Sequence, residues 1–104
     1  MTKFLYVYHG GSMPQSEEEG AKVMKAWTDW FAGLGAAVVD GGAPVGKSQT
    51  VSPGGSVAND GGANPASGYS VIDAKDPADA ERIAKGCPIL DAGGSIEVAP
   101  IIQM

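Results

Sequence analysis

The hydrophobic positions of this chain follow two periods, which together predict strands and helices in alternation. Residues 4–8 form an unbroken run of aromatic, leucine and valine side chains that stops at Gly10, and such a run is typical of a strand buried on both faces. Between Val23 and Leu34 apolar residues recur at every third or fourth position, which predicts an amphipathic helix that packs on a sheet. Shorter apolar runs predict three more strands, at residues 36–39, 69–73 and 96–102.

Capping residues predict where the helices begin. Ser16 followed by Glu19 forms a capping box, so the first helix starts there. Asp76 and Pro77 supply an N-cap and a first-turn proline for a second helix, which Pro88 ends. The predicted buried face of this second helix is Ala80, Ile83, Ala84 and Cys87.

The order of elements predicts the fold. Residues 43–68 are rich in Gly, Pro, Ser and Asn, and the segment from Gly41 to Gly68 is predicted to be a long surface loop with a weak hairpin between residues 49–51 and 56–58. Without this insertion the order is strand, helix, strand, strand, helix, strand. We therefore expect one α+β domain over residues 1–104, a ferredoxin-like two-layer sandwich in which a four-stranded antiparallel sheet carries both helices on one face.

The uncovered face of that sheet predicts a partner. The first strand has bulky apolar residues on both of its faces, so the side away from the helices is too apolar to remain in water. We expect a second copy of the chain to cover it, sheet against sheet, which makes a homodimer.

Composition and charge narrow the possible partners. The chain has 12 Asp and Glu against 7 Lys and Arg, a net charge of -5, and no basic run that would neutralise a phosphate backbone, so we expect no nucleic acid partner. The apolar run near the N-terminus is too short for a signal peptide or a membrane span. A single cysteine, Cys87, rules out an internal disulfide and reads as a small core residue, so a soluble cytoplasmic protein is expected. His9 is the only histidine, and we expect no metal site and no cofactor.

Residues 41–48 match the phosphate-binding pattern G-x-x-x-x-G-K-S letter for letter. That pattern needs a helix that opens at the Lys-Ser pair, so that its N-terminal amides point at the anion. Here the next four residues are strand-like, and Pro53 breaks them. The match predicts a glycine-rich loop and no nucleotide site.

Two residues are candidates for acid/base catalysis. His9 lies where the first strand ends, and an ordinary histidine pKa suits a general base. Glu97 lies between two apolar residues of the last strand and therefore points to the open face, where Tyr6, Tyr8 or His9 could be its partner. The alternatives remain open: His9 could anchor a loop, and Glu97 could simply stay in water.

Further side chains are candidates for binding a substrate. If they face the open side of the sheet, the phenols of Tyr6, Tyr8 and Tyr69 could flank an aromatic or enol-like ligand, although they could equally pack in a dimer interface. Ser70 neighbours Tyr69, and Asp60 lies in the long loop, where it is either a turn former or a ligand contact.

Several segments together resemble the YCII-related, or DGPF-domain, family. They are KFLYVYHG (3–10), NDGG (59–62), GYSVI (68–72), GCP (86–88) and GGSIEV (93–98). The resemblance implies a dimeric α+β barrel, clefts between the two sheets as candidate sites, small-molecule chemistry that is mostly unassigned, and a bacterial type of protein.

The chain departs from this family at two positions. Some members are thought to use a His on the first helix and an Asp after the second helix. Here the first helix has no His, and the Asp-Pro position reads Cys87-Pro88, so that dyad is not carried over. The signature Asp-Gly-Pro-Phe reads Asp-Gly-Gly-Ala at residues 60–63.

Two functions remain as hypotheses. The first is a small-molecule acid/base enzyme, isomerase- or lyase-like, that acts through His9 and Glu97 in a cleft between the two sheets of a dimer. The alternative is a non-catalytic module, which binds a small ligand or serves only as a structural dimer.

Overall fold

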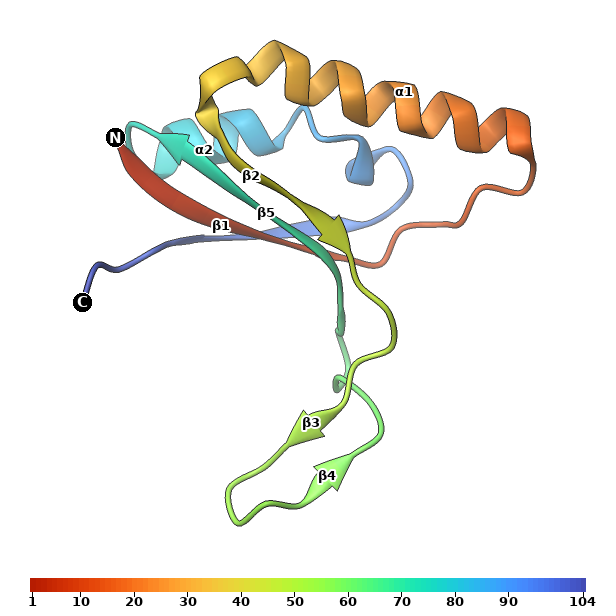
Figure 1. The fold of residues 1–104 in the computed structure, drawn as a ribbon, viewed down its shortest axis with the longest axis vertical. Coiled ribbons are helices and arrows are strands. Elements are labelled where there is room, and N and C mark those ends of the chain that lie inside the picture. The colour runs from red at the N-terminus through yellow and green to blue at the C-terminus, as the bar shows by residue number, and fades with distance from the viewer.

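A four-stranded antiparallel sheet with two helices on one face forms the body of the molecule (Figure 1). The computed structural model describes residues 1–104, and the strand order is β2-β5-β1-β6. This confirms the predicted ferredoxin-like α+β fold, and within one chain the sheet does not close into a barrel. The elements are β1 (Thr2–His9), α1 (Glu17–Leu34), β2 (Val38–Pro44), β3 (Thr50–Val51), β4 (Val57–Ala58), β5 (Ala66–Ala74), α2 (Pro77–Ala84) and β6 (Ser95–Pro100), with 3₁₀ turns η1 (Gly35–Ala37) and η2 (Pro88–Leu90).

The first helix begins at the predicted capping box. Ser16 Oγ accepts a hydrogen bond from the backbone N–H of Glu19 at 3.1 Å, and the Glu19 carboxylate accepts one from the N–H of Gln15 at 2.7 Å. The first contact satisfies an amide that the first turn would leave without a partner, and the second satisfies the amide just before the N-cap. The start of α1 is therefore decided by local side chains.

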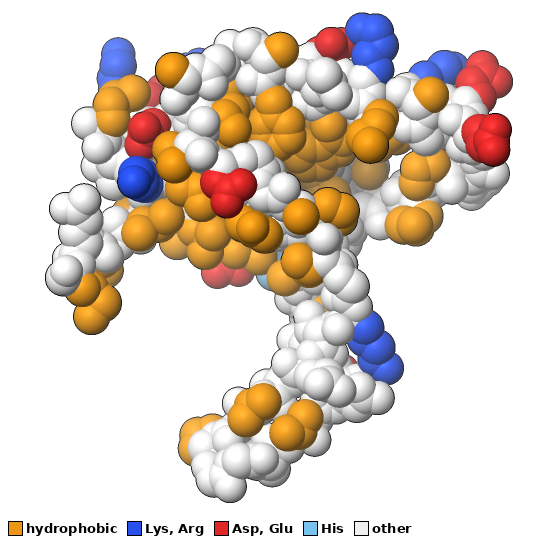
Figure 2. Space-filling view, viewed as in Figure 1, with side chains coloured by type: hydrophobic (Ala, Val, Ile, Leu, Met, Phe, Trp, Pro, Cys, Tyr) orange, Lys and Arg blue, Asp and Glu red, His pale blue; other side chains and the backbone are white.

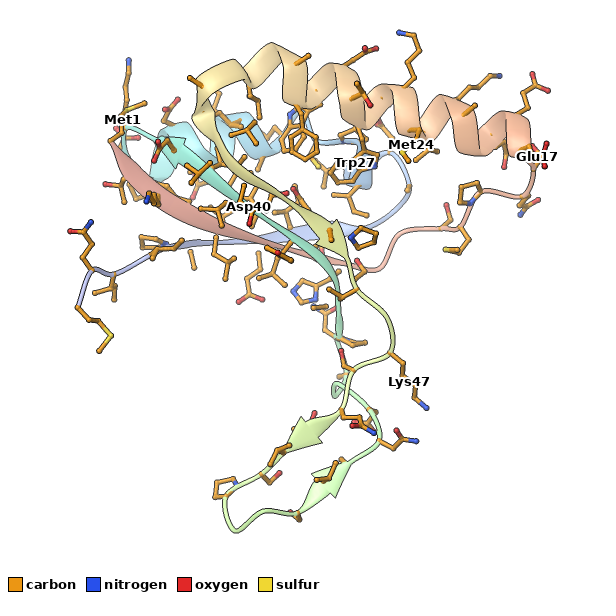
Figure 3. All side chains as sticks on the ribbon, viewed as in Figure 1. Met1, Glu17, Met24, Trp27, Asp40 and Lys47 are labelled. Carbon is orange, nitrogen blue, oxygen red and sulfur yellow. The ribbon has the colours of Figure 1, made fainter.

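Only the second half of α1 covers the sheet. Trp27 and Trp30 pack against the core, whereas Val23 and Met24 are 41% and 69% exposed. Figure 3 shows why, because the end of α1 at Glu17 extends past the sheet. The predicted apolar stripe is thus covered over part of its length.

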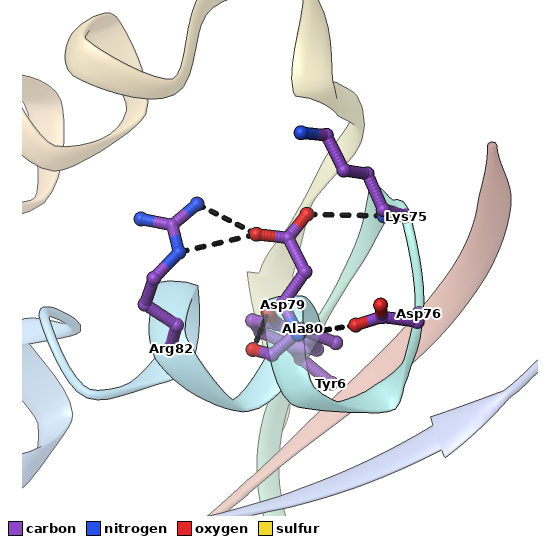
Figure 4. Close-up of polar contacts among 6 residues, drawn as sticks. All are labelled: Tyr6, Lys75, Asp76, Asp79, Ala80 and Arg82. Carbon is purple, nitrogen blue, oxygen red and sulfur yellow. Dashed lines mark hydrogen bonds and ion pairs between the residues drawn. The ribbon is translucent and has the colours of Figure 1, made fainter.

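The second helix begins at Asp76, as predicted (Figure 4). Asp76 Oδ1 accepts the N–H of Asp79 at 2.8 Å. Asp79 in turn accepts the N–H of Lys75 at 3.0 Å and binds the Arg82 guanidinium at 2.7 Å. The Lys75 amide and Arg82 together lower the pKa of the Asp79 carboxyl. This cluster fixes the helix start without using any residue of the open face.

The first strand turns its large aromatic side chains toward the helices, so the expectation that Tyr6 and Tyr8 lie on the open face was wrong. Tyr6 is fully buried and its hydroxyl donates to the Ala80 carbonyl of α2 (Figure 4). Tyr8 donates to Ser70 Oγ at 2.8 Å, and Ser70 donates to the carbonyl of Gly41 at 2.8 Å. Aromatic rings fill the space between sheet and helix, and each phenol finds a partner there. Ser70 is therefore also buried on the helix side.

The second strand lies later in the chain than predicted. Residues 36 and 37 belong to the turn η1, and β2 continues to Pro44. Its pairing with β5 shifts twice, and within the second shift, between Asp40 and Ala43, Gly42 has a φ of 72°. A Cβ at Gly42 would lie 1.7 Å from the backbone oxygen of Tyr69, so only glycine permits this close approach. The last strand is shorter than predicted, because residues 101 and 102 lie outside β6.

The β3–β4 hairpin extends away from the sheet and helices, which form the body of the molecule (Figure 1). We call residues 45–65, which contain this hairpin, the arm. The radius of gyration is 15.0 Å, whereas a compact chain of this length has about 13 Å. Only 12 of the 104 residues are buried. A single chain therefore leaves much of its apolar surface uncovered, on the body and along the arm (Figure 2).

Neither helix of this structure combines the length and the hydropathy that crossing a lipid bilayer requires.

Candidate functional site

Small apolar side chains cover the open face of the sheet. Leu5 and Val7 of β1 lie on this face, because the residues between them point to the helices. Across the strands, Leu5 is opposite Val71, and Val7 lies between Tyr69 of β5 and Glu97 of β6. The middle of the face is thus apolar, with one phenol and one carboxylate in the row of Val7, and Lys3 lies opposite Asp73 at the other end of β1.

His9 lies one row further along, at the end of β1, where it is opposite Ser95 and diagonal to Glu97. Its Nε2 atom is 3.0 Å from Glu97 Oε1, and its Nδ1 atom is 3.1 Å from the carbonyl oxygen of Pro65. His9 is 8% exposed, and the β-bulge between Tyr8 and His9 lies at this point. Bulges are common next to functional sites because they re-aim a side chain. Of the three partners considered for Glu97, the structure selects the histidine.

The Pro65 carbonyl determines which ring nitrogen carries a proton. A carbonyl oxygen only accepts hydrogen bonds, so Nδ1 must be protonated. The contact between Nε2 and Glu97 then needs one proton of its own, on either the ring or the carboxyl. The Pro65 carbonyl, and after it the Glu97 carboxylate, raise the pKa of His9 above its ordinary value of 6.5. The pair therefore favours an imidazolium beside a carboxylate.

This geometry changes the role expected for each residue. Both nitrogens of the His9 ring are occupied by protein acceptors, so the ring is not a free general base. The Glu97 side chain is 67% exposed and uses only Oε1 in this contact, which leaves Oε2 open to a ligand. Glu97 is thus the accessible proton acceptor, and His9 holds it in place and supplies positive charge.

The other predicted residues lie apart from this pair, with one exception. Tyr69 is on the open face and 37% exposed. Tyr6, Tyr8 and Ser70 are buried beneath the helices, where they contact protein groups only. Asp60 lies on the arm and accepts the N–H two residues ahead at 3.0 Å, which is the turn-forming role.

Cys87 is buried in the core beside α2, as its sequence position predicted. Burial raises the pKa of its thiol to about 11. At neutral pH the thiolate needed for nucleophilic chemistry is therefore scarce.

Sequence reasoning missed two features of the structure. The first is Pro65, whose backbone carbonyl shapes the chemistry of His9; a main-chain partner leaves no mark in the side-chain pattern. The second is a cleft of about 400 Å³ between the first half of α1 and the segment around η2. Its lining includes Met13, Lys22, Trp27 and Asp91. The prolines before α1 and after α2 were the only local signal of loops that could enclose it.

A second cavity of about 210 Å³ lies between α2 and β6 and is lined mainly by apolar residues. Neither cavity includes His9 or Glu97. In a single chain the pair lies on an open surface, so a substrate there needs a further wall.

The fold and this surface define the class of protein: a ferredoxin-like α+β domain whose uncovered sheet carries a histidine–glutamate pair. The chain belongs to the YCII-related domain family, whose model matches residues 4–104, essentially the whole chain. No curated protein matches it.

Proposed function

We propose that this protein is a small-molecule acid/base enzyme, isomerase- or lyase-like, that acts at Glu97 and His9 on the open sheet face of a homodimer. The contact of His9 Nε2 with Glu97 Oε1 at 3.0 Å, with Nδ1 bound to Pro65, carries this proposal. A carboxylate and an imidazole held together by a third group are a recurring arrangement for proton transfer.

The protonation state of the pair favours proton abstraction from carbon. Glu97 Oε2 takes a proton from a carbon acid, and the substrate becomes an enolate with one negative charge. The pair, neutral before the step, then carries one positive charge on the adjacent imidazolium. That charge stabilises the enolate, and the proton can return to a different carbon or serve a leaving group. His9 is the positioning residue in this mechanism, and the apolar neighbours Val7 and Tyr69 suit an aromatic or enol-like substrate.

A second copy of the chain supplies the missing wall. Leu5, Val7 and Val71 are only half-buried and Tyr69 is exposed, so the open face is suited to pack against an identical face. Two such faces would leave Glu97 in a cleft between the sheets. The single free cysteine is consistent with our proposal that the protein works in the cytoplasm.

A proton-exchange assay tests this function. The protein is incubated in D₂O with a panel of carbon acids that includes a 2-oxo acid, a 1,3-dicarbonyl and an aryl ketone, and deuterium incorporation is followed by ¹H NMR. We expect exchange with at least one compound, lost by at least about 100-fold in Glu97→Gln, because general-base catalysis typically contributes that much. Glu18→Gln removes an exposed carboxylate on α1 and is the matched control. Equal exchange in all three proteins would refute the mechanism.

The cleft beside α1 favours a second candidate function. Half of its lining residues are hydrophobic, among them Trp27, and Glu19, Lys22 and Asp91 bring charges of both signs to it. Such a cleft suits non-catalytic binding of a small amphipathic ligand. Binding of a panel compound that quenches tryptophan fluorescence, without exchange and unchanged in Glu97→Gln, would favour this module. A wild type that neither binds nor exchanges any compound would favour a purely structural dimer.

A further inference from the structure

The two faces of the arm differ: one forms a hydrogen bond within the arm, and the other, the bare valine face, consists of exposed valine side chains. Val51 and Val57 lie directly opposite each other and are 70% and 60% exposed. The neighbouring pair, Thr50 and Ala58, points to the other side, where the Thr50 hydroxyl donates to the carbonyl of Asp60 at 2.7 Å. An isolated two-stranded hairpin is only marginally stable in water. The bare valine face therefore lacks the cover that such a hairpin ordinarily needs.

The root of the arm is tightly packed beside the open face. Gly61 lies between Ser48 and Pro65, and a Cβ at Gly61 would lie 2.7 Å from the Cβ atom of each. Pro65 in turn accepts the hydrogen bond from His9. The arm thus leaves the molecule at the edge of the open face and extends away from its own body (Figure 1). A molecule seated on that face meets the arm.

The area of the sheet indicates that the face alone makes a small interface. Four strands about 4.8 Å apart, with six to nine residues at about 3.3 Å each, give a footprint of about 400–500 Å². A stable complex buries about 800 Å² on each partner. The arm supplies surface that the sheet lacks, and in a two-fold dimer it does so twice.

The charge of the arm suits a second copy of this chain. The whole chain has a net charge of -5, which makes two copies repel. Residues 45–65 contain one cation, Lys47, and one anion, Asp60, so the arm is neutral. Figure 3 shows Lys47 near the root of the arm, away from the hairpin tip. The valine face can therefore approach an acidic copy without added repulsion.

We propose that the arm of each protomer packs against the partner, with the Val51–Val57 face in contact with the partner's body. This inference rests on the homodimer in the proposed function and adds the element that holds it together. The sheets supply the central contact, and the arms enclose it from the edge where His9 lies.

Adjacent residues of β4 allow a matched test. Val57→Asp places a carboxylate on the bare face, and Ala58→Asp places the same charge one residue away on the opposite face. Both positions are exposed in one chain, so neither substitution disturbs its core. Dimer dissociation constants are measured by sedimentation velocity over a dilution series, and near-UV circular dichroism verifies the fold. We expect Val57→Asp to weaken the dimer at least about ten-fold and Ala58→Asp to change it less than about two-fold, because a charge buried on apolar surface without a partner costs more than 1.4 kcal/mol.

The possible results of this test distinguish the role of the arm from the existence of the dimer. A dimer that tolerates both substitutions equally overturns the role of the arm and leaves the sheet-face dimer in place. A wild type that stays monomeric at all concentrations overturns both. Loss of dimer in Val57→Asp with unchanged dissociation in Ala58→Asp supports the arm. The exchange assay on wild type and Glu97→Gln is a separate readout, because it reports the acid/base pair, whereas the dilution series reports the association.

Discussion

The difference in folding stability between wild type and Glu97→Gln should depend on pH in a defined direction. The native pKa of His9 is raised above 6.5 by the Pro65 carbonyl and by Glu97. A raised histidine pKa stabilises the native state fully below 6.5, where both folded and unfolded chains hold the proton, and this contribution disappears as pH rises through the native pKa. Wild type should therefore be more stable than Glu97→Gln at pH 6.

At high pH the His9 Nε2 atom and the Glu97 carboxylate no longer form a hydrogen bond, because neither carries a proton to donate. Above the native pKa the ring loses the Nε2 proton, while Nδ1 keeps its proton for Pro65. The Nε2 lone pair then faces a carboxylate, which cannot donate to it. The amide of Gln at position 97 can donate instead. We expect Glu97→Gln to equal or exceed wild type at pH 9.

The size of the effect follows from exposure. Because the Glu97 side chain is 67% exposed, solvent screens the pair, and it contributes no more than about 0.5–1 kcal/mol at pH 6. With a urea m-value of about 1–2 kcal/mol/M for a chain of this size, the unfolding midpoint should fall by about 0.3–1 M. At high salt the difference should shrink.

Urea unfolding followed by tryptophan fluorescence provides the measurement, since Trp27 and Trp30 both pack against the core. Protein concentration is held constant, because the proposed dimer would add stability that depends on concentration. Glu18→Gln, whose carboxylate lies 3.9 Å from Lys22 with both side chains exposed, is the control and should shift the midpoint little at either pH. Equal stability of Glu97→Gln and wild type at both pH values would show that the contact has no energetic role.

Three further predictions concern the buried structure around the site. Gly42→Ala should destabilise the fold by more than about 2 kcal/mol, since its Cβ collides with the backbone of β5 and its φ is 72°, whereas Gly46→Ala, with open space around it, should be nearly neutral in thermal unfolding. Ser70→Ala should lower the free energy of unfolding by about 1–3 kcal/mol, because it leaves the Tyr8 hydroxyl and the Gly41 carbonyl without partners. Tyr8→Phe should cost less, because it removes one donor and leaves Ser70 bonded to Gly41. Urea unfolding ranks the two variants, and the reverse order would contradict this hydrogen-bond network. Cys87 should react with a thiol reagent at pH 8 only after unfolding, and rapid native labelling would contradict its burial and its pKa of about 11.

Local sequence signals determined where the helices begin and in which order the helices and strands follow. The capping residues Ser16 and Asp76 act on amides within a few positions of themselves, so the helix starts could be predicted without knowledge of the fold. Alternation in β6 likewise predicted the side on which Glu97 lies, because Ile96 and Val98 pack against the core. The order of elements then sufficed for the ferredoxin-like sheet.

Only the tertiary structure decided which face of β1 meets the helices. Both faces of residues 4–8 are apolar, so the pattern contains no preference, and the choice depends on ring volume against α1 and on partners such as the Ala80 carbonyl for Tyr6. The same holds for Pro65, which lies 56 residues from His9 in sequence and reaches it with a main-chain oxygen. Period and propensity act over a few residues, whereas a proton-sharing pair depends on contacts that chain folding brings together from distant positions.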